Sequence, residues 1–204
     1  MPRCVSSSVF APPWKALMSH RVVLLASGSG TLAQAIIDAE ELDIEIVALI
    51  SDNPQAQALK RAQESNIQTF VLPMKDSRDE WNQGIVQTVV SLSADLVVSA
   101  GFMRILPSDF VNRFPTINSH PALLPQFPGA HAVRDALAAG VSVTGTTVHW
   151  VDDGVDTGPI ITQMEVPVLP GDDEATLHER IKKVERGLIV ATIALILPTL
   201  ERNV

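Results

Sequence analysis

Short apolar runs alternate with segments of helical periodicity through the first half of the chain. The runs that we expect to be strands cover residues 21–26, 44–50, 69–72 and 95–100, and the helical segments cover 31–39, 55–64 and 78–92. Two runs, at 22–25 and 96–98, lack polar alternation, which is typical of strands that helices cover on both faces. The pattern predicts an α/β protein with a doubly wound, mostly parallel, Rossmann-like sheet.

The order of elements changes in the second half. A helix is expected at 131–139, but the strands expected at 144–151 and 160–168 then follow each other with no helix between them. They predict an antiparallel extension at one edge of the sheet. A long helix at 174–197, with Asp172 or Asp173 as its N-cap, is the last predicted element.

The size of the chain fits one domain. With 204 residues, of which 46% are hydrophobic, it can bury a full core, and we expect one domain at 20–204. Residues 1–19 are rich in serine and proline and contain no acidic residue, which predicts a disordered extension. They lack the apolar stretch of a signal peptide. A transit peptide, or a start at Met18, remains an alternative.

Charge and cysteine content narrow the class of protein. A net charge of −8 and a pI near 5.0 leave no broad basic surface, so we expect small-molecule substrates and no nucleic acid. The longest apolar run, 188–197, is too short to span a bilayer, so no membrane role is expected. Cys4 is the only cysteine, which excludes a disulfide framework and favours a cytoplasmic location.

Two short segments carry the residue types of an active site. Asn118 and His120 stand two apart at the end of an apolar run, so an extended backbone points both side chains to one face. Asp156 follows in a glycine-flanked loop that can approach them. An amide can hold a carbonyl oxygen, an imidazole can stabilise an oxyanion, and a carboxylate favours the imidazolium. A histidine between prolines is often a packed core residue, but Asn118 beside it favours acyl-transfer chemistry.

These residues resemble the site of the folate-dependent formyltransferases. The resemblance is carried by Asn118, His120, the segment Pro-Ala-Leu-Leu-Pro at 121–125, and Asp156. The segments Ala-Ser-Gly-Ser-Gly-Thr at 26–31 and Gly-Phe-Met-Arg-Ile-Leu at 101–106 extend it to the members that formylate phosphoribosylglycinamide. It implies 10-formyltetrahydrofolate as co-substrate, the amine of 5-phosphoribosylglycinamide as acceptor, and a role in purine synthesis.

The glycine-rich turn at 27–31 has two interpretations. Free N–H groups at a strand-to-helix turn attract phosphate, but such turns also use glycine for geometry alone. It is neither a dinucleotide fingerprint, because Ala33 takes the third glycine position, nor a Walker loop. The resemblance implies that Gly30, Thr31 and Leu32 bind the ribonucleotide phosphate. Leu32 stands where the family often has asparagine, so the donors left are backbone N–H groups and the Thr31 hydroxyl.

The resemblance also assigns residues further along the chain. Lys182 and Glu185 would by spacing alone form a surface ion pair, but the family uses this position for the ribonucleotide, with Glu185 accepting from the ribose hydroxyls. Arg104 is expected to meet the glutamate tail or ring edge of the folate. The residues expected to contact the folate are Arg78, Met103, Arg104, Ile105, Leu106, Asn118, Asp152, Asp153, Gly154, Val155 and Asp156.

We expect no metal. His131 and His149 lack ligand spacing with His120, and His149 is expected instead to help organise the site. The predicted mechanism is direct attack of the amine on the formyl carbon, without a covalent enzyme intermediate. Asn118 and protonated His120 stabilise the tetrahedral oxyanion, Asp156 keeps His120 charged, and a bound water moves the proton.

Three alternatives share parts of this pattern. Methionyl-tRNA formyltransferase and formyltetrahydrofolate hydrolase use the same catalytic block, but each normally carries a further domain for which we expect no room in 204 residues. A non-catalytic nucleotide-binding module would have no use for Asn118, His120 and Asp156. The sequence is compatible with a monomer or a homodimer.

Overall fold

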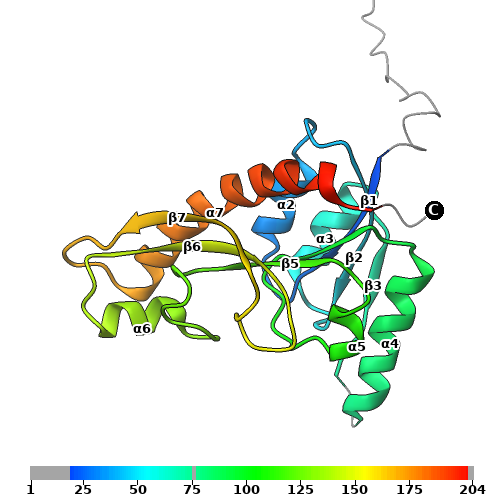
Figure 1. Ribbon diagram of the computed structural model, residues 1–204, viewed down its shortest axis with the longest axis horizontal. Helices are drawn as coiled ribbons and strands as arrows, with labels where there is room; N and C mark the ends of the chain where they lie inside the picture. The colour runs from blue at the N-terminus through cyan, green and yellow to red at the C-terminus, as the bar shows by residue number, and fades with distance from the viewer. Residues whose placement is uncertain (1–18, 75–76, 202–204) are drawn as a thin grey trace, which may run out of the picture.

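A seven-stranded sheet forms the centre of the computed structural model, which describes residues 19–74 and 77–201 (Figure 1). Its strands are β1 (His20–Leu25), β2 (Ile44–Ser51), β3 (Thr69–Val71), β4 (Leu96–Ser99), β5 (Thr116–His120), β6 (Val143–Trp150) and β7 (Ile160–Pro167). The helices are α2 (Thr31–Ile37), α3 (Gln57–Glu64), α4 (Arg78–Ser91), α5 (Ser108–Val111), α6 (Ala132–Ala138), α7 (Glu174–Ile196) and the short 3₁₀ helix η1 (Leu197–Thr199). The extension expected at 1–19 lies, apart from Ser19, outside the described residues.

The strand order is β3-β2-β1-β4-β5-β6-β7. The first five strands in this order pair in parallel, whereas β6 pairs antiparallel with β5 and β7 antiparallel with β6. The predicted doubly wound sheet with an antiparallel extension is therefore confirmed. The extension also includes the β5–β6 pair, because the connection through α6 reverses the direction of the chain.

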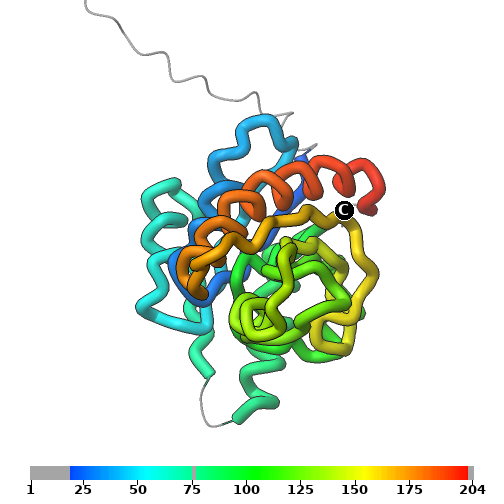
Figure 2. The backbone as a smooth tube through the Cα atoms, turned by 90° about the vertical axis from the view of Figure 1, so that its left-hand side faces the viewer, coloured from blue at the N-terminus to red at the C-terminus, as the bar shows by residue number. Residues whose placement is uncertain are grey.

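Helices cover both faces of the sheet. On β1, Val22 and Leu24 pack into the cluster under α2, α3 and α7, whereas Val23 and Leu25 pack under α4 and α5. Figure 2 shows α7, in orange and red, on the opposite side of the molecule from the green α4. Burial on both faces explains why these strands show no polar alternation in the sequence.

Two elements were not delimited by the apolar pattern. Helix α5 has a single turn of four residues, too short for a periodicity to appear. Strand β5 begins with an apolar residue only at Ile117 and continues with the polar run Asn118, Ser119 and His120, three side chains that belong to the site instead of the core. The boundaries of the predicted elements otherwise agree with the structure to within two residues.

The last helix begins where the sequence predicts. Asp173 is the N-cap of α7, and its Oδ1 accepts from the Thr176 N–H at 2.8 Å. In return, the Asp173 N–H donates to Thr176 Oγ1 at 2.9 Å, which completes a capping box. In residues 19–74 and 77–201, no helix has the length and apolar character needed to cross a membrane.

Candidate active site

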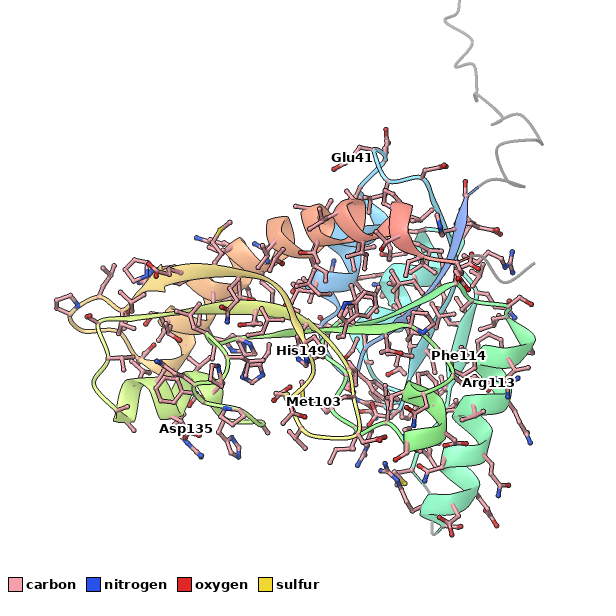
Figure 3. The ribbon with its side chains drawn as sticks, viewed as in Figure 1. Glu41, Met103, Arg113, Phe114, Asp135 and His149 are labelled. Carbon is pink, nitrogen blue, oxygen red and sulfur yellow. The ribbon has the colours of Figure 1, made fainter. Side chains whose placement is uncertain are left out.

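The carboxyl ends of β1, β4 and β5 border one cavity of about 480 Å³, a volume typical of small-molecule sites. It lies where the strand order reverses between β1 and β4, the usual ligand position in open α/β sheets. Figure 3 shows His149 and Met103, both of which line the cavity, near the middle of the molecule. Of the residues expected to contact substrates, all line this cavity except Arg78 and Asp153.

Strand pairing brings the polar side chains of the site together. Alternation along β5 places Asn118 and His120 on one face, and the antiparallel register sets His149 of β6 directly opposite Asn118. Asn118 Nδ2 lies 3.2 Å from His149 Nε2 and donates to Asp156 Oδ1 at 3.4 Å. His149 Nδ1 donates to the Trp150 carbonyl at 2.8 Å, which fixes the ring.

The His120 imidazole is buried, with only 4% of its surface exposed. Its Nε2 lies 2.8 Å from the Phe127 carbonyl oxygen, and its Nδ1 lies 3.3 Å from Asp156 Oδ2. A carbonyl and a carboxylate can only accept hydrogen bonds, so the imidazolium, with two N–H donors, satisfies both contacts. The surroundings of this ring therefore suit a charged histidine.

Asp156 is held at the centre of the group by its backbone and its hydrogen bonds. Its φ of 55° is left-handed, and its Oδ2 accepts from the Gly129 N–H at 2.8 Å. Burial raises the pKa of this carboxyl, but the His149 hydrogen bond, the Gly129 N–H and the charges of His120 and His149 outweigh it. The pKa of Asp156 consequently lies below its usual value of 3.8, and the group is a carboxylate at neutral pH.

The glycine-rich turn is shaped by close packing against α3. Gly30 has a φ of 70°, and a Cβ at this position would lie 2.6 Å from Ala58 Cα. The Gly28 and Ser29 carbonyls accept from the Ala58 N–H and from Arg61 Nε, at 3.1 and 2.8 Å. The N-cap residue of α2 is Gly30, which has no side chain to cap the helix, so the first-turn N–H groups receive no capping hydrogen bond from it.

Two arginine side chains hold the segment after β4, one through an ion pair and the other through a backbone carbonyl. Arg104 Nε donates to the buried Asp52 carboxylate at 2.6 Å, and the Arg104 side chain stays 40% exposed. Arg78, outside the cavity, donates to the Ile105 carbonyl and lies 5.0 Å from the Trp81 ring. Arg78 therefore holds this segment from a position outside the cavity.

The exposure of the individual side chains in this segment differs. Met103 and Ile105 are 69% and 60% exposed, whereas Leu106 faces the core. In the loop after β6, the exposed Asp152 accepts from the Gly154 N–H at 3.0 Å and from Thr157 Oγ1 at 2.7 Å. Exposed apolar side chains beside a cavity are suited to pack against a planar ligand.

One face of α7 completes the cavity. Glu185 lies over the sheet and accepts from Ser119 Oγ at 2.7 Å, while Lys182 Nζ donates to Glu179 at 2.7 Å. The surface ion pair between Lys182 and Glu185 is therefore absent from these described residues. Burial raises the pKa of the Glu185 carboxyl. The Ser119 hydrogen bond lowers this pKa, and the charges of Lys182 and Arg186 lower it to a smaller extent.

Sequence reasoning missed three residues at this site. His178 lines the cavity one turn before Lys182, and its spacing from Lys182 and Glu185 at i, i+4 and i+7 was the available signal. Ser119 and Gly129 had no such signal, because their roles depend on contacts between distant segments. Among the residues that the structure describes, His131 occupies the N-cap position of α6 without a side-chain capping hydrogen bond, and no three potential metal ligands lie together.

Comparisons with known proteins agree on one family. The formyl transferase family matches residues 20–193. The phosphoribosylglycinamide formyltransferase of Mycobacterium tuberculosis is 51% identical over 179 residues, covering 85% of this chain and 83% of that protein. The Escherichia coli protein of the same name is 38% identical and covers 85% of each chain. Glycinamide ribonucleotide transformylase 1 from Geobacillus kaustophilus has a TM-score of 0.84 at 38% identity, covering 88% of this chain and 99% of that chain.

Proposed function

Because the chain belongs to the formyl transferase family, we propose that it transfers the formyl group of 10-formyltetrahydrofolate to the primary amine of 5-phosphoribosylglycinamide. The products are 5-phosphoribosyl-N-formylglycinamide and tetrahydrofolate, in a step of purine synthesis. The observation that carries the proposal is the meeting of Asn118, His120 and Asp156 at one cavity, with a carboxylate 3.3 Å from a buried imidazole. A core histidine would need neither partner.

The two substrates would occupy different sides of the cavity. The first-turn N–H groups at Gly30, Thr31 and Leu32 are the donors for the ribonucleotide phosphate, because a helix N-terminus attracts anions. Lys182 and Glu185 on α7 would hold the rest of the ribonucleotide. Leu32 contributes only its backbone, since its side chain is buried in the core.

The folate would lie against the segment after β4 and the loop after β6. The exposed side chains of Met103, Ile105 and Val155 provide apolar contacts for its ring system. Arg104 uses Nε for Asp52, which leaves the Nη groups of its partly exposed side chain for a glutamate carboxylate.

The reaction would proceed by direct attack of the amine on the formyl carbon, which gives a tetrahedral oxyanion. Asn118 Nδ2 makes two long contacts, at 3.2 and 3.4 Å, and can turn one hydrogen toward that oxygen. Rotation of His120 away from the Phe127 carbonyl would free its Nε2–H as the second donor. The C–N10 bond then breaks while a water carries the amine proton to N10.

Asp156 would hold the imidazolium in place while the oxyanion forms. Its carboxylate charge balances His120, and the Gly129 N–H keeps it oriented at 2.8 Å. A carboxylate charge held in this way stabilises the imidazolium without itself having to reorganise during the reaction. The 10-formyltetrahydrofolate is a co-substrate here, and the described residues offer no cluster for a metal.

The charge and cysteine content of the chain bear on its location and on the class of its partners. We propose one formyltransferase domain at 20–204, acting in the cytoplasm as a monomer or homodimer on small molecules. The family match at 20–193 and the single sheet support the domain, and the net charge of −8 argues against a polyanionic partner.

Absorbance during loss of the formyl group from 10-formyltetrahydrofolate tests the proposal, with and without 5-phosphoribosylglycinamide. Wild type should react only with the ribonucleotide, and His120→Ala should be inactive. His131→Ala is the matched control, because it removes the same side chain from an exposed position at the start of α6. Reaction without the ribonucleotide would indicate a hydrolase, and no reaction at all would refute the assignment.

A further inference from the structure

Ser119 stands between the two strand residues that face the reacting groups, yet its side chain points the other way. Strand alternation places it on the face of Ile117, which packs under α7. There its Oγ donates to Glu185 Oε1 at 2.7 Å, across 66 residues of sequence. Both residues are buried, with 7% and 8% of their surfaces exposed. The hydroxyl therefore joins the catalytic strand to the ribonucleotide side of the cavity.

The Glu185 carboxylate fixes the direction of this hydrogen bond, and a second hydroxyl lies near Ser119 Oγ. Thr146 Oγ1 on β6 lies 3.5 Å from Ser119 Oγ. Because an ionised carboxylate can only accept, the single Ser119 proton goes to Glu185, and Thr146 can donate to the Ser119 oxygen. Glu185 Oε2 has no hydrogen bond to any of the described residues, while the Glu185 side chain lines the cavity. One carboxylate oxygen is thus held and the other is left for a ligand.

The same hydrogen bond affects the charge of Glu185. Burial raises the pKa of its carboxyl, and the Ser119 hydroxyl of β5 is the first influence that lowers it, ahead of the charges of Lys182 and Arg186 on α7. A protonated carboxyl has less capacity to accept from ribose hydroxyls. Without the Ser119 hydroxyl, burial would still raise the pKa of Glu185, and the hydrogen bond that lowers this pKa most would be lost.

We propose that Ser119 is a positioning residue for the ribonucleotide, fixing the Glu185 carboxylate so that its second oxygen accepts hydrogen bonds from the ribose hydroxyls. This inference rests on the proposed function, because it takes 5-phosphoribosylglycinamide as the ligand of this side of the cavity. It extends that function by giving β5 a role toward both the formyl group and the acceptor. Asn118 and His120 act on the formyl group from one face, and Ser119 orients the acceptor from the other.

The test compares Ser119→Ala with wild type in the formyl-transfer assay. The KM for 5-phosphoribosylglycinamide should rise about tenfold, as expected for losing a hydrogen bond to a charged group. The KM for 10-formyltetrahydrofolate and kcat should stay within about threefold. With an acceptor that lacks the ribose hydroxyls, the two enzymes should show equal KM values. The KM difference for the normal acceptor should also grow as the pH is lowered, because burial raises the pKa of Glu185 and the variant lacks the Ser119 hydrogen bond that opposes this rise.

Matched variants separate positioning from packing. Ser119→Thr keeps the hydroxyl and should retain most of the affinity, whereas Ser119→Val, equal to threonine in size, should behave like the alanine variant. This pair also serves if Ser119→Ala does not fold. Equal KM values for the threonine and valine variants would overturn the inference, as would a KM increase that persists with the acceptor lacking ribose hydroxyls. Wild-type turnover that does not need the ribonucleotide would instead overturn the proposed function.

Discussion

Replacing Asp156 by asparagine removes one charge and places an amide NH2 group where Oδ1 now accepts from Asn118 Nδ2 at 3.4 Å. The side chain keeps its shape, and its amide oxygen can still accept from the Gly129 N–H that now lies 2.8 Å from Oδ2. What disappears is the charge 3.3 Å from His120 Nδ1. At an effective dielectric constant of about 20, a charge pair at this distance is worth about 5 kcal/mol, an upper bound for the interaction.

That energy sets the expected size of the kinetic effect. Since 1.36 kcal/mol corresponds to a factor of ten, 5 kcal/mol allows at most a few thousandfold, and partial compensation by solvent reduces it. We expect kcat of Asp156→Asn to fall about 10²- to 10³-fold, with both KM values within about threefold. Thermal unfolding should shift by about 2–4 °C at most, because the Gly129 contact survives.

The pH profile gives a second check on the same charge. The pKa of Asp156 is lowered in the folded protein, so the stability it contributes is complete above the unfolded value of about 3.8 and is lost as the pH falls through the folded value. The rate ratio of wild type to variant should accordingly show no step from the titration of Asp156 itself between pH 6 and 9. Glu165→Gln removes an exposed carboxylate on β7 and is the control. A kcat of Asp156→Asn within threefold of wild type would refute the electrostatic reasoning.

Three further changes test the framework around the site. Gly30→Ala introduces a Cβ 2.6 Å from Ala58 Cα at a φ of 70°, so the KM for the ribonucleotide should rise at least tenfold while the folate KM stays constant in steady-state assays. Thr147→Val leaves three hydrogen-bonding partners, two of them buried, without the Thr147 hydroxyl, and urea unfolding should show a loss of about 1–3 kcal/mol; an unchanged midpoint would contradict this. Asp173→Ala removes the cap of α7, which lowers the melting temperature at pH 7. Because the Thr176 N–H lowers the pKa of Asp173, the difference should vanish in calorimetry only as the pH falls below about 3.8.

The sheet and its two helical layers could be predicted from the sequence because each depends on local patterns. Uninterrupted apolar runs such as 22–25 identify strands buried on both faces, and the glycines at 28 and 30 identify the turn after the first of them. The pairing of Asn118 and His120 on one face also follows from a local rule, the alternation of side chains along an extended segment. These inferences depend on local sequence patterns and require no knowledge of tertiary contacts.

Contacts between distant segments could not be predicted in this way. The hydrogen bond from Ser119 to Glu185 and the ion pair between Arg104 and Asp52 depend on how α7 and the loop after β4 settle on the sheet. Spacing suggested a Lys182–Glu185 pair, but burial of Glu185 over β5 gave that carboxylate a different partner. Lys182 and Ser119 are both chemically reasonable partners for the Glu185 carboxylate. Tertiary packing determines that Ser119 is the partner, which the local sequence pattern does not indicate.

The two-sided use of β5 restricts how this segment can change in length. Inserting or deleting one residue before Asn118 would exchange the faces of every following side chain in the strand. The amide and the imidazole would then point toward α7, and Ser119 would point toward the formyl group. Substitutions within β5 can be compensated by neighbours, but a one-residue insertion or deletion cannot. Loops spliced into this protein therefore belong beyond His120 or before Thr116.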